Sequence, residues 1–225
     1  MEQPAALEAL AVEVGACRAC PRLVAWREQV GAEKRAAFRD EEYWARPVPG
    51  FGDPAARVVV VGLAPAAHGA NRTGRMFTGD RSGDFLYAAL WRTGFANQPT
   101  STDRSDGLTL RHAWITAPVR CAPPANKPTP DERDRCRPFL ERELALLTDV
   151  QVLIALGQFA HQVLSDHLGL RPRPRFAHGA VHELGDGRHM LDSFHVSQQN
   201  TFTGKLTPDM LDAVLLQARS LSRLA

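Results

Sequence analysis

A run of four valines, Val58–Val61, constrains the fold of this chain more than any other feature. β-Branched residues favour extended backbone, and a run without a polar position cannot leave one face in water. The run therefore predicts a central strand that is covered on both sides. Glycines and small residues follow it over residues 62–83. Such a loop brings backbone N–H groups close to a ligand.

Three further strand patterns alternate with helical patterns along the rest of the chain. The strand patterns cover residues 112–119, 150–156 and 188–196. The helical patterns cover residues 82–93, with Ser82 as the expected cap, and residues 129–147, 157–168 and 208–224. Alternation of this kind is typical of a parallel sheet with crossover helices. We therefore expect an α/β fold with a central four-stranded parallel sheet flanked by helices.

Length and composition are those of an ordinary globular protein. The 225 residues, of which 44% are hydrophobic and 23% charged, form a single expected domain over residues 1–225 and exclude a disordered chain. A net charge of +2 means that a nucleic acid has to be met by a local basic face. Neither a secretion signal nor a membrane-spanning stretch is recognisable. We expect a cytoplasmic monomer that does not contact a membrane.

The chain has four cysteines, at two distant places. Cys17 and Cys20 are separated by two residues, which suits clamping of a metal or cluster. Cys121 follows the second expected strand, and Cys136 lies early in an expected helix. Because the cytosol is reducing, one shared four-thiolate site with an N-terminal ligand segment is favoured over disulfides. The spacing leaves zinc, an iron–sulfur cluster and metal-free buried thiols open.

The loop over residues 62–83 lacks the signatures of the common nucleotide-binding loops. Gly69 and Gly74 have the spacing of a phosphate-binding loop, but Arg75 and Met76 stand where its lysine and hydroxyl are needed. No G-x-G-x-x-G motif follows the first strand either. Phe77 has two interpretations, as a core anchor or as an aromatic face for a planar ligand.

A polar segment, residues 195–205, follows the fourth expected strand. Ligands of open α/β sheets bind beyond the C-terminal ends of the strands, which makes this segment, residues 62–83 and residues 117–130 the candidate site. Its amides and hydroxyls are suited to hydrogen-bonding edges or phosphate oxygens. His195, at the end of a strand among such neighbours, is the candidate functional histidine.

These motifs together resemble the iron–sulfur branch of the uracil-DNA glycosylases, and within it the family 5 (type b) enzymes. The resemblance extends over most of the chain and is carried by Cys17-x2-Cys20, residues 62–83, residues 121–124 with Cys136, residues 156–160 and residues 195–200. It implies a [4Fe–4S] cluster on Cys17, Cys20, Cys121 and Cys136. It also implies excision of uracil and related damaged bases from double-stranded DNA by base flipping, which leaves an abasic site.

The resemblance implies residues that bind the base. Phe77 would stack on the flipped ring, and the backbone of Gly62, Leu63 and Ala64 would read its edge. The other substrate-binding candidates of the matching motifs are Ala117, Ser197 and Asn200. C–N cleavage leaves negative charge on the base, and His195 would donate a hydrogen bond to its O2.

Two positions depart from the pattern of related iron–sulfur glycosylases. Leu63 stands where those enzymes carry a carboxylate that orients water, and Ala117 stands where an asparagine reads the amide edge of uracil. A looser pocket that accepts several damaged bases is therefore expected. Asp80 is the candidate for positioning or activating water, with helix capping as its alternative role. Asn71 is the neutral alternative to Asp80.

The expected DNA grip comes from polar side chains of the same loops on phosphates. The candidates are Arg72, Arg75, Gln198, Gln199 and Lys205. A lyase step is not expected, because the chain has only three lysines and Lys205 is the one in the segment after the fourth expected strand. Two other classes of function stay open from the sequence, namely a non-catalytic nucleic-acid-binding module stabilised by a metal or Fe–S cluster and a redox protein.

Overall fold

The computed structural model describes residues 3–224, and a six-stranded sheet forms the centre of this part of the chain. The strand order is β1-β3-β2-β4-β6-β5. The strands are β1 (Phe51–Gly52), β2 (Val58–Val61), β3 (Ala113–Thr116), β4 (Val152–Leu156), β5 (Val181–Glu183) and β6 (His189–Ser193). The α-helices are α1 (Gln3–Ala16), α2 (Pro21–Glu33), α3 (Ala70–Thr73), α4 (Arg81–Arg92), α5 (Pro130–Leu146), α6 (Gln158–His167), α7 (Gln198–Phe202) and α8 (Pro208–Leu221). Two short 3-10 helices are η1 (Ala36–Phe38) and η2 (Pro124–Asn126).

The four predicted strands are present and parallel, in the order β3-β2-β4-β6. The prediction of four strands was wrong in number, because β1 and β5 extend the sheet at its two edges in antiparallel orientation. These edge strands contain two and three residues. A segment that short has no periodicity that sequence patterns can detect.

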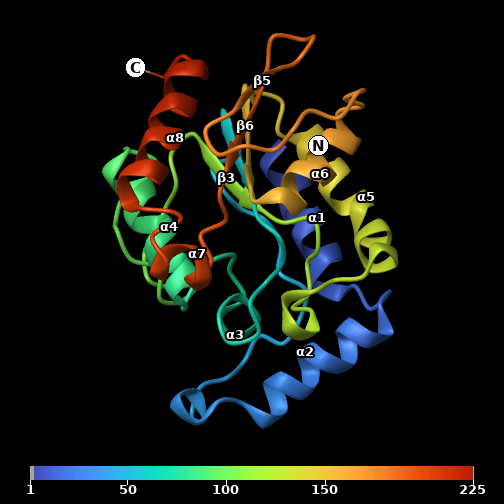
Figure 1. Ribbon diagram of the computed structural model, residues 1–225. Coiled ribbons are helices and arrows are strands. Elements are labelled where there is room, and N and C mark those ends of the chain that lie inside the picture. Colours follow the sequence, from blue (N-terminus) through green and yellow to red (C-terminus); the bar gives the residue numbers. More distant parts are fainter. Residues whose placement is uncertain (1–2, 225) are drawn as a thin grey trace.

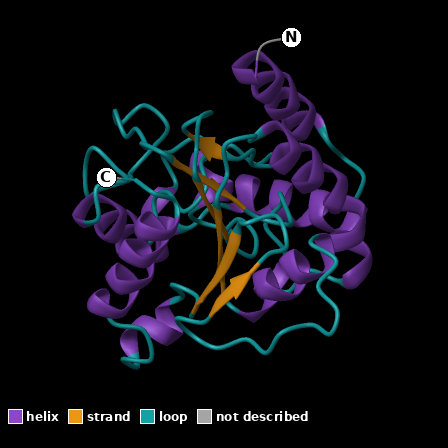
Figure 2. Ribbon diagram, turned by 90° about the horizontal axis from the view of Figure 1, so that it is seen from above, coloured by secondary structure: helices purple, strands orange, loops and turns teal. Residues whose placement is uncertain are grey.

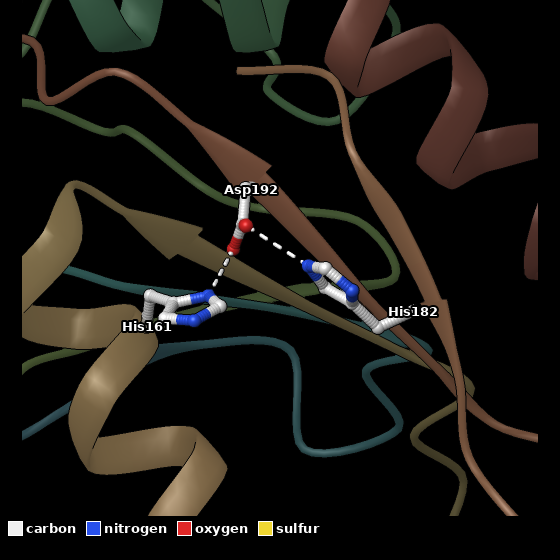
Figure 3. Close-up of side chains that lie close together, drawn as sticks. All are labelled: His161, His182 and Asp192. Carbon is white, nitrogen blue, oxygen red and sulfur yellow. Dashed lines mark hydrogen bonds and ion pairs between the residues drawn. The ribbon is translucent and has the colours of Figure 1, made fainter. Parts of the chain in front are cut away.

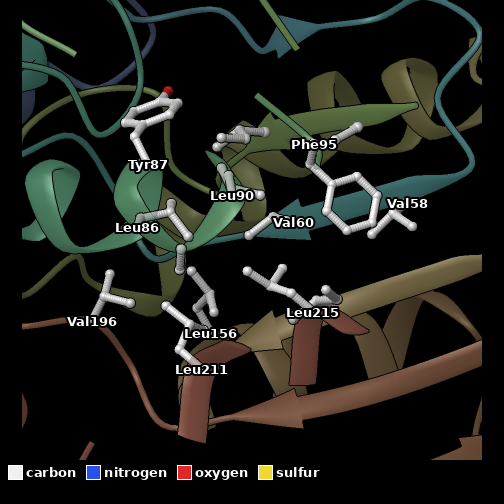
Figure 4. Close-up of a cluster of buried hydrophobic side chains, with 14 of the residues drawn as sticks. Val58, Val60, Leu86, Tyr87, Leu90, Phe95, Leu156, Val196, Leu211 and Leu215 are labelled. Carbon is white, nitrogen blue, oxygen red and sulfur yellow. The ribbon is translucent and has the colours of Figure 1, made fainter. Parts of the chain in front are cut away.

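The valine run explains how the sheet is buried. Val58 and Val60 pack into one hydrophobic cluster, and Val59 and Val61 pack into another on the opposite face. The first cluster contains leucines of α4 and α8 (Figure 4). The second contains residues of α1 and α6. Figures 1 and 2 show the result, with helices on both sides of the central strands.

Local capping sets where the long helices begin. Thr129 forms a capping box with Glu132 at the start of α5, and Thr207 caps α8. The prediction of Ser82 as the cap of α4 was wrong, because the Asp80 carboxylate accepts the Gly83 N–H there. Helices α1 and α2 were not predicted. Helix α1 packs along α5, and α2 begins directly after Cys20.

The C-terminal ends of the parallel strands lie at one edge of the sheet, where α3, α6 and α7 begin (Figure 1). Residues 62–83 follow β2 at this edge, and residues 194–199 follow β6. Within residues 3–224, no helix has the length and apolar character that spanning a membrane requires.

Candidate active site

An open cleft lies at the C-terminal edge of the sheet. Its walls come from residues 35–42, from the loop after β2, from residues 101–105, from η2 and from residues 195–199. Nine of the candidate residues line it, namely Leu63, Ala64, Arg72, Phe77, Asp80, His195, Ser197, Gln198 and Gln199. The topology therefore brings the loops after β2 and β6 together, as the site prediction required.

Phe77 lies in the cleft with a strained backbone. Its φ of 52° is in the left-handed region, which non-glycine residues rarely adopt and which clusters at functional sites. Two glycines make this possible. A Cβ on Gly62 would lie 2.7 Å from the Phe77 ring, and a Cβ on Gly83 would overlap the Phe77 carbonyl. The ring is half-buried and lines the cleft.

His195 lies opposite Phe77, with 6.1 Å between the ring centroids and 39° between the ring planes. Burial lowers the pKa of His195 to about 4. The ring is therefore neutral at physiological pH. A neutral ring still has one N–H that can donate a hydrogen bond to a developing anion. The Asn200 side-chain amide donates to the His195 carbonyl at 2.8 Å, so Asn200 supports the loop from outside the cleft lining.

The two carboxylate oxygens of Asp80 have different surroundings. Oδ1 accepts the Gly83 N–H at 2.9 Å as the cap of α4. Oδ2 lies where a Cβ on Gly69 would be, so only glycine fits beside it. Burial raises the pKa of Asp80, and hydrogen bonds from the Gly83 and Ser82 backbone offset this only in part. The capping alternative is present, and Oδ2 remains for a second partner.

Besides Asn200, three of the catalytic and base-binding candidates do not line the cleft. Asn71 is fully buried and its amide donates to the Arg27 carbonyl at 3.2 Å, which corrects its assignment as an alternative catalytic residue. Ala117 lies inside the core cluster of the sheet, so the expectation that it touches the base is also wrong. Gly62 is buried beneath the Phe77 ring, where it supports the ring from below.

Two of the arginines expected to contact phosphates are structural. Arg75 is 5% exposed, forms an ion pair with Asp106 at 2.6 Å and bonds Ser101. Arg72 is 8% exposed, forms an ion pair with Glu41 and donates to the Gly79 carbonyl. Their guanidinium donors are used within the protein, which corrects the prediction that they grip DNA.

Other cations on the rim are free to meet phosphates. Arg81 and Arg104 line the cleft, are exposed and have no carboxylate partner within residues 3–224. Each lies over an aromatic ring, Phe202 for Arg81 and Trp44 for Arg104, at 5.5 and 4.5 Å. Sequence reasoning missed Arg104 because residues 97–109 contain no recognised motif. Lys205 is exposed beside this face, with its Nζ 4.8 Å from the Phe194 ring centroid.

The four cysteines meet at one place, away from the cleft. All four are unpaired thiols, and they line a single small cavity with Leu23 and Val119. Burial raises the pKa of Cys121 to about 12 and that of Cys136 to about 11, while Arg27 and Arg120 respectively oppose the rise. Four thiolates at this place therefore require a positive group among them.

The sulfur atoms are spread more widely than a single metal ion requires. Around one tetrahedral zinc, with Zn–S bonds of about 2.3 Å, the sulfurs lie about 3.8 Å from one another. Among the described residues, no three of these Sγ atoms all lie within 4.8 Å of one another. The arrangement fits a larger group held by four cysteines, as a [4Fe–4S] cluster is.

Two N–H groups point at the cysteine sulfurs. The Arg27 guanidinium, 2% exposed, donates to Cys121 Sγ at 3.0 Å and to the Cys17 carbonyl at 3.2 Å. The Arg120 backbone N–H donates to Cys136 Sγ at 3.3 Å. Because Asn71 bonds the Arg27 carbonyl, the loop after β2 is tied to the helix that borders the cysteines.

Comparisons with known proteins agree with this geometry. The sequence profile of the Uracil DNA glycosylase superfamily matches residues 49–219. The type-5 uracil-DNA glycosylase of Mycobacterium bovis is 57% identical over 212 residues, which cover 93% of this chain and 79% of the relative. That of Thermus thermophilus is 55% identical over 218 residues, which cover 96% and 99%. That of Pyrobaculum aerophilum is 45% identical over 202 residues, which cover 90% and 87%.

These matches include the loops after β2 and β6, which form the cleft, and in the long alignments they extend over most of both chains. The resemblance that the motifs indicated is thereby confirmed. The chain belongs to the uracil DNA glycosylase superfamily and, within it, to the type-5 branch.

Proposed function

We propose that this protein is a DNA-repair glycosylase that flips uracil and other damaged bases out of double-stranded DNA and hydrolyses their N-glycosidic bond. The observation that carries the proposal is the pair of neighbouring rings, Phe77 and His195, which line the cleft together with 6.1 Å between their centroids. A base inside a duplex is unreachable, and flipping it costs a few kcal/mol, least for a mismatched or damaged base. The Phe77 ring offers stacking that offsets this cost.

The reaction needs charge stabilisation on the departing base. Cleavage of the C–N bond leaves an anionic pyrimidine and a cation-like sugar. His195 is neutral and donates one N–H, which we assign to O2 of the leaving base. Backbone groups at Leu63 and Ala64, which line the cleft, are placed to read the edge of the ring. No amine lies among the cleft-lining side chains, which favours hydrolysis over a lyase step.

The pocket supports broad specificity. Leu63 lines it without a carboxylate, and Ala117 is withdrawn into the core. The base edge therefore meets few side-chain groups that distinguish uracil from other deaminated bases. The test is a panel of duplexes containing uracil, hypoxanthine, xanthine or an oxidised pyrimidine, assayed for alkali-labile sites. Excision of uracil alone would contradict broad specificity, and DNA binding without any alkali-labile product would favour the non-catalytic module.

We assign a [4Fe–4S] cluster to Cys17, Cys20, Cys121 and Cys136. The spread of the Sγ atoms supports this choice over a single zinc ion. When bound, the cluster supplies a rigid cross-link between α2 and the segment after β3. Iron and sulfide analysis of the purified protein, with its visible absorption spectrum, tests the assignment. One equivalent of zinc without iron would contradict it.

Asp80→Asn is expected to slow single-turnover uracil excision about 10²-fold, the low end for a positioned base. Oδ2 is the atom that we assign to the attacking water, while asparagine keeps an oxygen for the cap. Because burial raises the pKa of Asp80, the wild-type rate should fall as pH is lowered through that raised pKa. The variant should lack this fall.

The melting temperature of Asp80→Asn controls for the cap, and Asp80→Ala, which loses both oxygens, should be less stable by about 1 kcal/mol. Wild-type excision by Asp80→Asn at saturating enzyme would leave Asp80 with the capping role alone.

Arg104→Ala is expected to weaken DNA binding similarly for all sequences and to reduce the log–log salt slope by about 0.9. The reason is that Arg104 is an exposed rim cation without a carboxylate partner among the described residues. Fluorescence anisotropy at several salt concentrations measures the slope. Arg142→Ala is the matched control, because Arg142 is also exposed but pairs with Glu13 where α5 packs on α1. An equal change in both variants would refute a local contact.

A further inference from the structure

Behind the cleft, three side chains from three elements form a buried network (Figure 3). Asp192 of β6 is fully buried and forms hydrogen bonds with His161 Nδ1 of α6 at 2.8 Å and with His182 Nε2 of β5 at 2.9 Å. His161 is 1% exposed. Its other ring nitrogen donates to the Pro174 carbonyl at 2.9 Å. None of these residues lines the cleft, and the proposed reaction does not use them.

The network fixes the segment that leads into β5. The Ala177 N–H donates to the Asp192 carboxylate at 3.3 Å, and the Gly179 N–H donates to the Asp192 carbonyl at 2.8 Å. Phe176 packs its ring edge on His161, with 5.6 Å between centroids. Anchors therefore lie on both sides of His178.

His178 in turn touches the residue before His195. Its Nδ1 accepts the Phe194 N–H at 3.1 Å, and its ring stacks on the Phe194 ring at 4.9 Å with 19° between planes. On the other side of the histidine, Asn200 holds the His195 carbonyl. The backbone of His195 is thus held immediately before and immediately after the residue.

We propose that His161, Asp192 and His182 form a brace that holds His178 against Phe194, which makes His178 and Asp192 positioning residues for His195. The inference rests on the leaving-group role proposed for His195. Displacement of a catalytic group by about 1 Å can cost about 10²-fold in rate, so a brace of this kind affects catalysis without touching the substrate.

The same three side chains have the donor set of a transition-metal site, and their ligand atoms all lie within 4.8 Å of one another. Both carboxylate oxygens of Asp192 already have hydrogen-bond partners, which are His161, His182 and the Ala177 N–H. A metal ion would have to replace these bonds. If the three residues form a brace, the protein holds no zinc or nickel ion through Asp192. Metal analysis should therefore find the same zinc and nickel content in Asp192→Asn as in the wild type.

The test compares His178→Ala with His178→Asn, whose amide oxygen restores an acceptor for Phe194. His178→Ala should lower the single-turnover excision rate about 10-fold or more while half-saturating enzyme concentration stays within about twofold. His178→Asn should recover part of the rate. NMR titration of the His195 ring provides a readout independent of activity. Its pKa of about 4 should rise toward the usual value in His178→Ala, because water reaches the ring.

His182→Ala removes one of the two histidines that bond Asp192. It should lower the excision rate and raise the His195 pKa as His178→Ala does, but by less. This variant tests the brace even if Asp192→Asn does not fold. His167→Ala, an exposed histidine at the other end of α6, is the matched control. Unchanged excision and an unchanged His195 titration in His178→Ala would overturn the brace, as would a metal ion that depends on Asp192. Unimpaired excision by His195→Ala would instead refute the proposed role of His195. The brace would then be tested by the NMR titration of the His195 ring in His178→Ala.

Discussion

His195→Ala is expected to slow single-turnover excision of uracil about 10³-fold while the affinity for DNA stays within about twofold. Removal of one preorganised donor from a developing anion costs about 10²–10³ in rate. The upper end applies because the ring is desolvated, as its lowered pKa of about 4 reflects, and a donor is worth more in a water-poor site. The measurement is quenched-flow product formation with enzyme in excess.

The pH dependence separates this role from general acid catalysis by an imidazolium. With a pKa of about 4, His195 is neutral from about pH 5 upward, so its titration should leave the wild-type rate unchanged between about pH 5 and 8. An acid limb with the usual histidine pKa that disappears in His195→Ala would contradict the neutral-donor role. His167→Ala controls for loss of an imidazole elsewhere.

The fold was predictable where the sequence had strong local patterns. Val58–Val61 determined a central strand, and its alternate valines are now seen to face two separate hydrophobic clusters. Capping signals such as Thr129 located helix starts to within a residue. The edge strands β1 and β5 could not be predicted, because their pairing depends on neighbours distant in sequence, as in Phe51 opposite Ile115.

The site was predictable as a location but less so as a set of side chains. Phe77 and His195 line the cleft because the loops that contain them follow β2 and β6 at the C-terminal ends of these strands. Asn71 and Arg72 belong to the same loop yet are buried and bond within the protein, because the loop coils into the short helix α3 there. Membership of a motif identifies the segment, whereas the direction of each side chain depends on the local backbone.

The cysteine site connects the fold with the cleft. Helix α2 lies against the rest of the protein through the small cluster of Leu23, Val119 and Cys121, and the chain continues from it into residues 35–42 of the cleft wall (Figure 1). A group held by the four cysteines would add a cross-link between α2 and the rest of the protein, beside the Asn71–Arg27 hydrogen bond.

Cys136→Ala is accordingly expected to lose the bound group and to lower the melting temperature by about 10 °C or more. Loss of a metal centre is among the changes that cost more than about 4 kcal/mol, and about 1 kcal/mol shifts the melting temperature of a chain this size by about 2–4 °C. DNA affinity should fall as well, because the wall that contains Phe38 and Glu41 continues from α2 and loses one of its attachments. Calorimetry, iron analysis and anisotropy on one preparation measure the three effects.

Ser165→Ala is the matched control for this prediction. Ser165 is fully buried, and its hydroxyl has no hydrogen-bond partner within residues 3–224, so removing one atom there costs little. If Cys136→Ala kept its iron, a normal melting temperature would mean that three cysteines suffice. If it lost its iron and still melted and bound DNA like the wild type, the group would not hold α2. With the bound group lost, a large fall in both stability and DNA affinity is the result that a cross-linking role predicts.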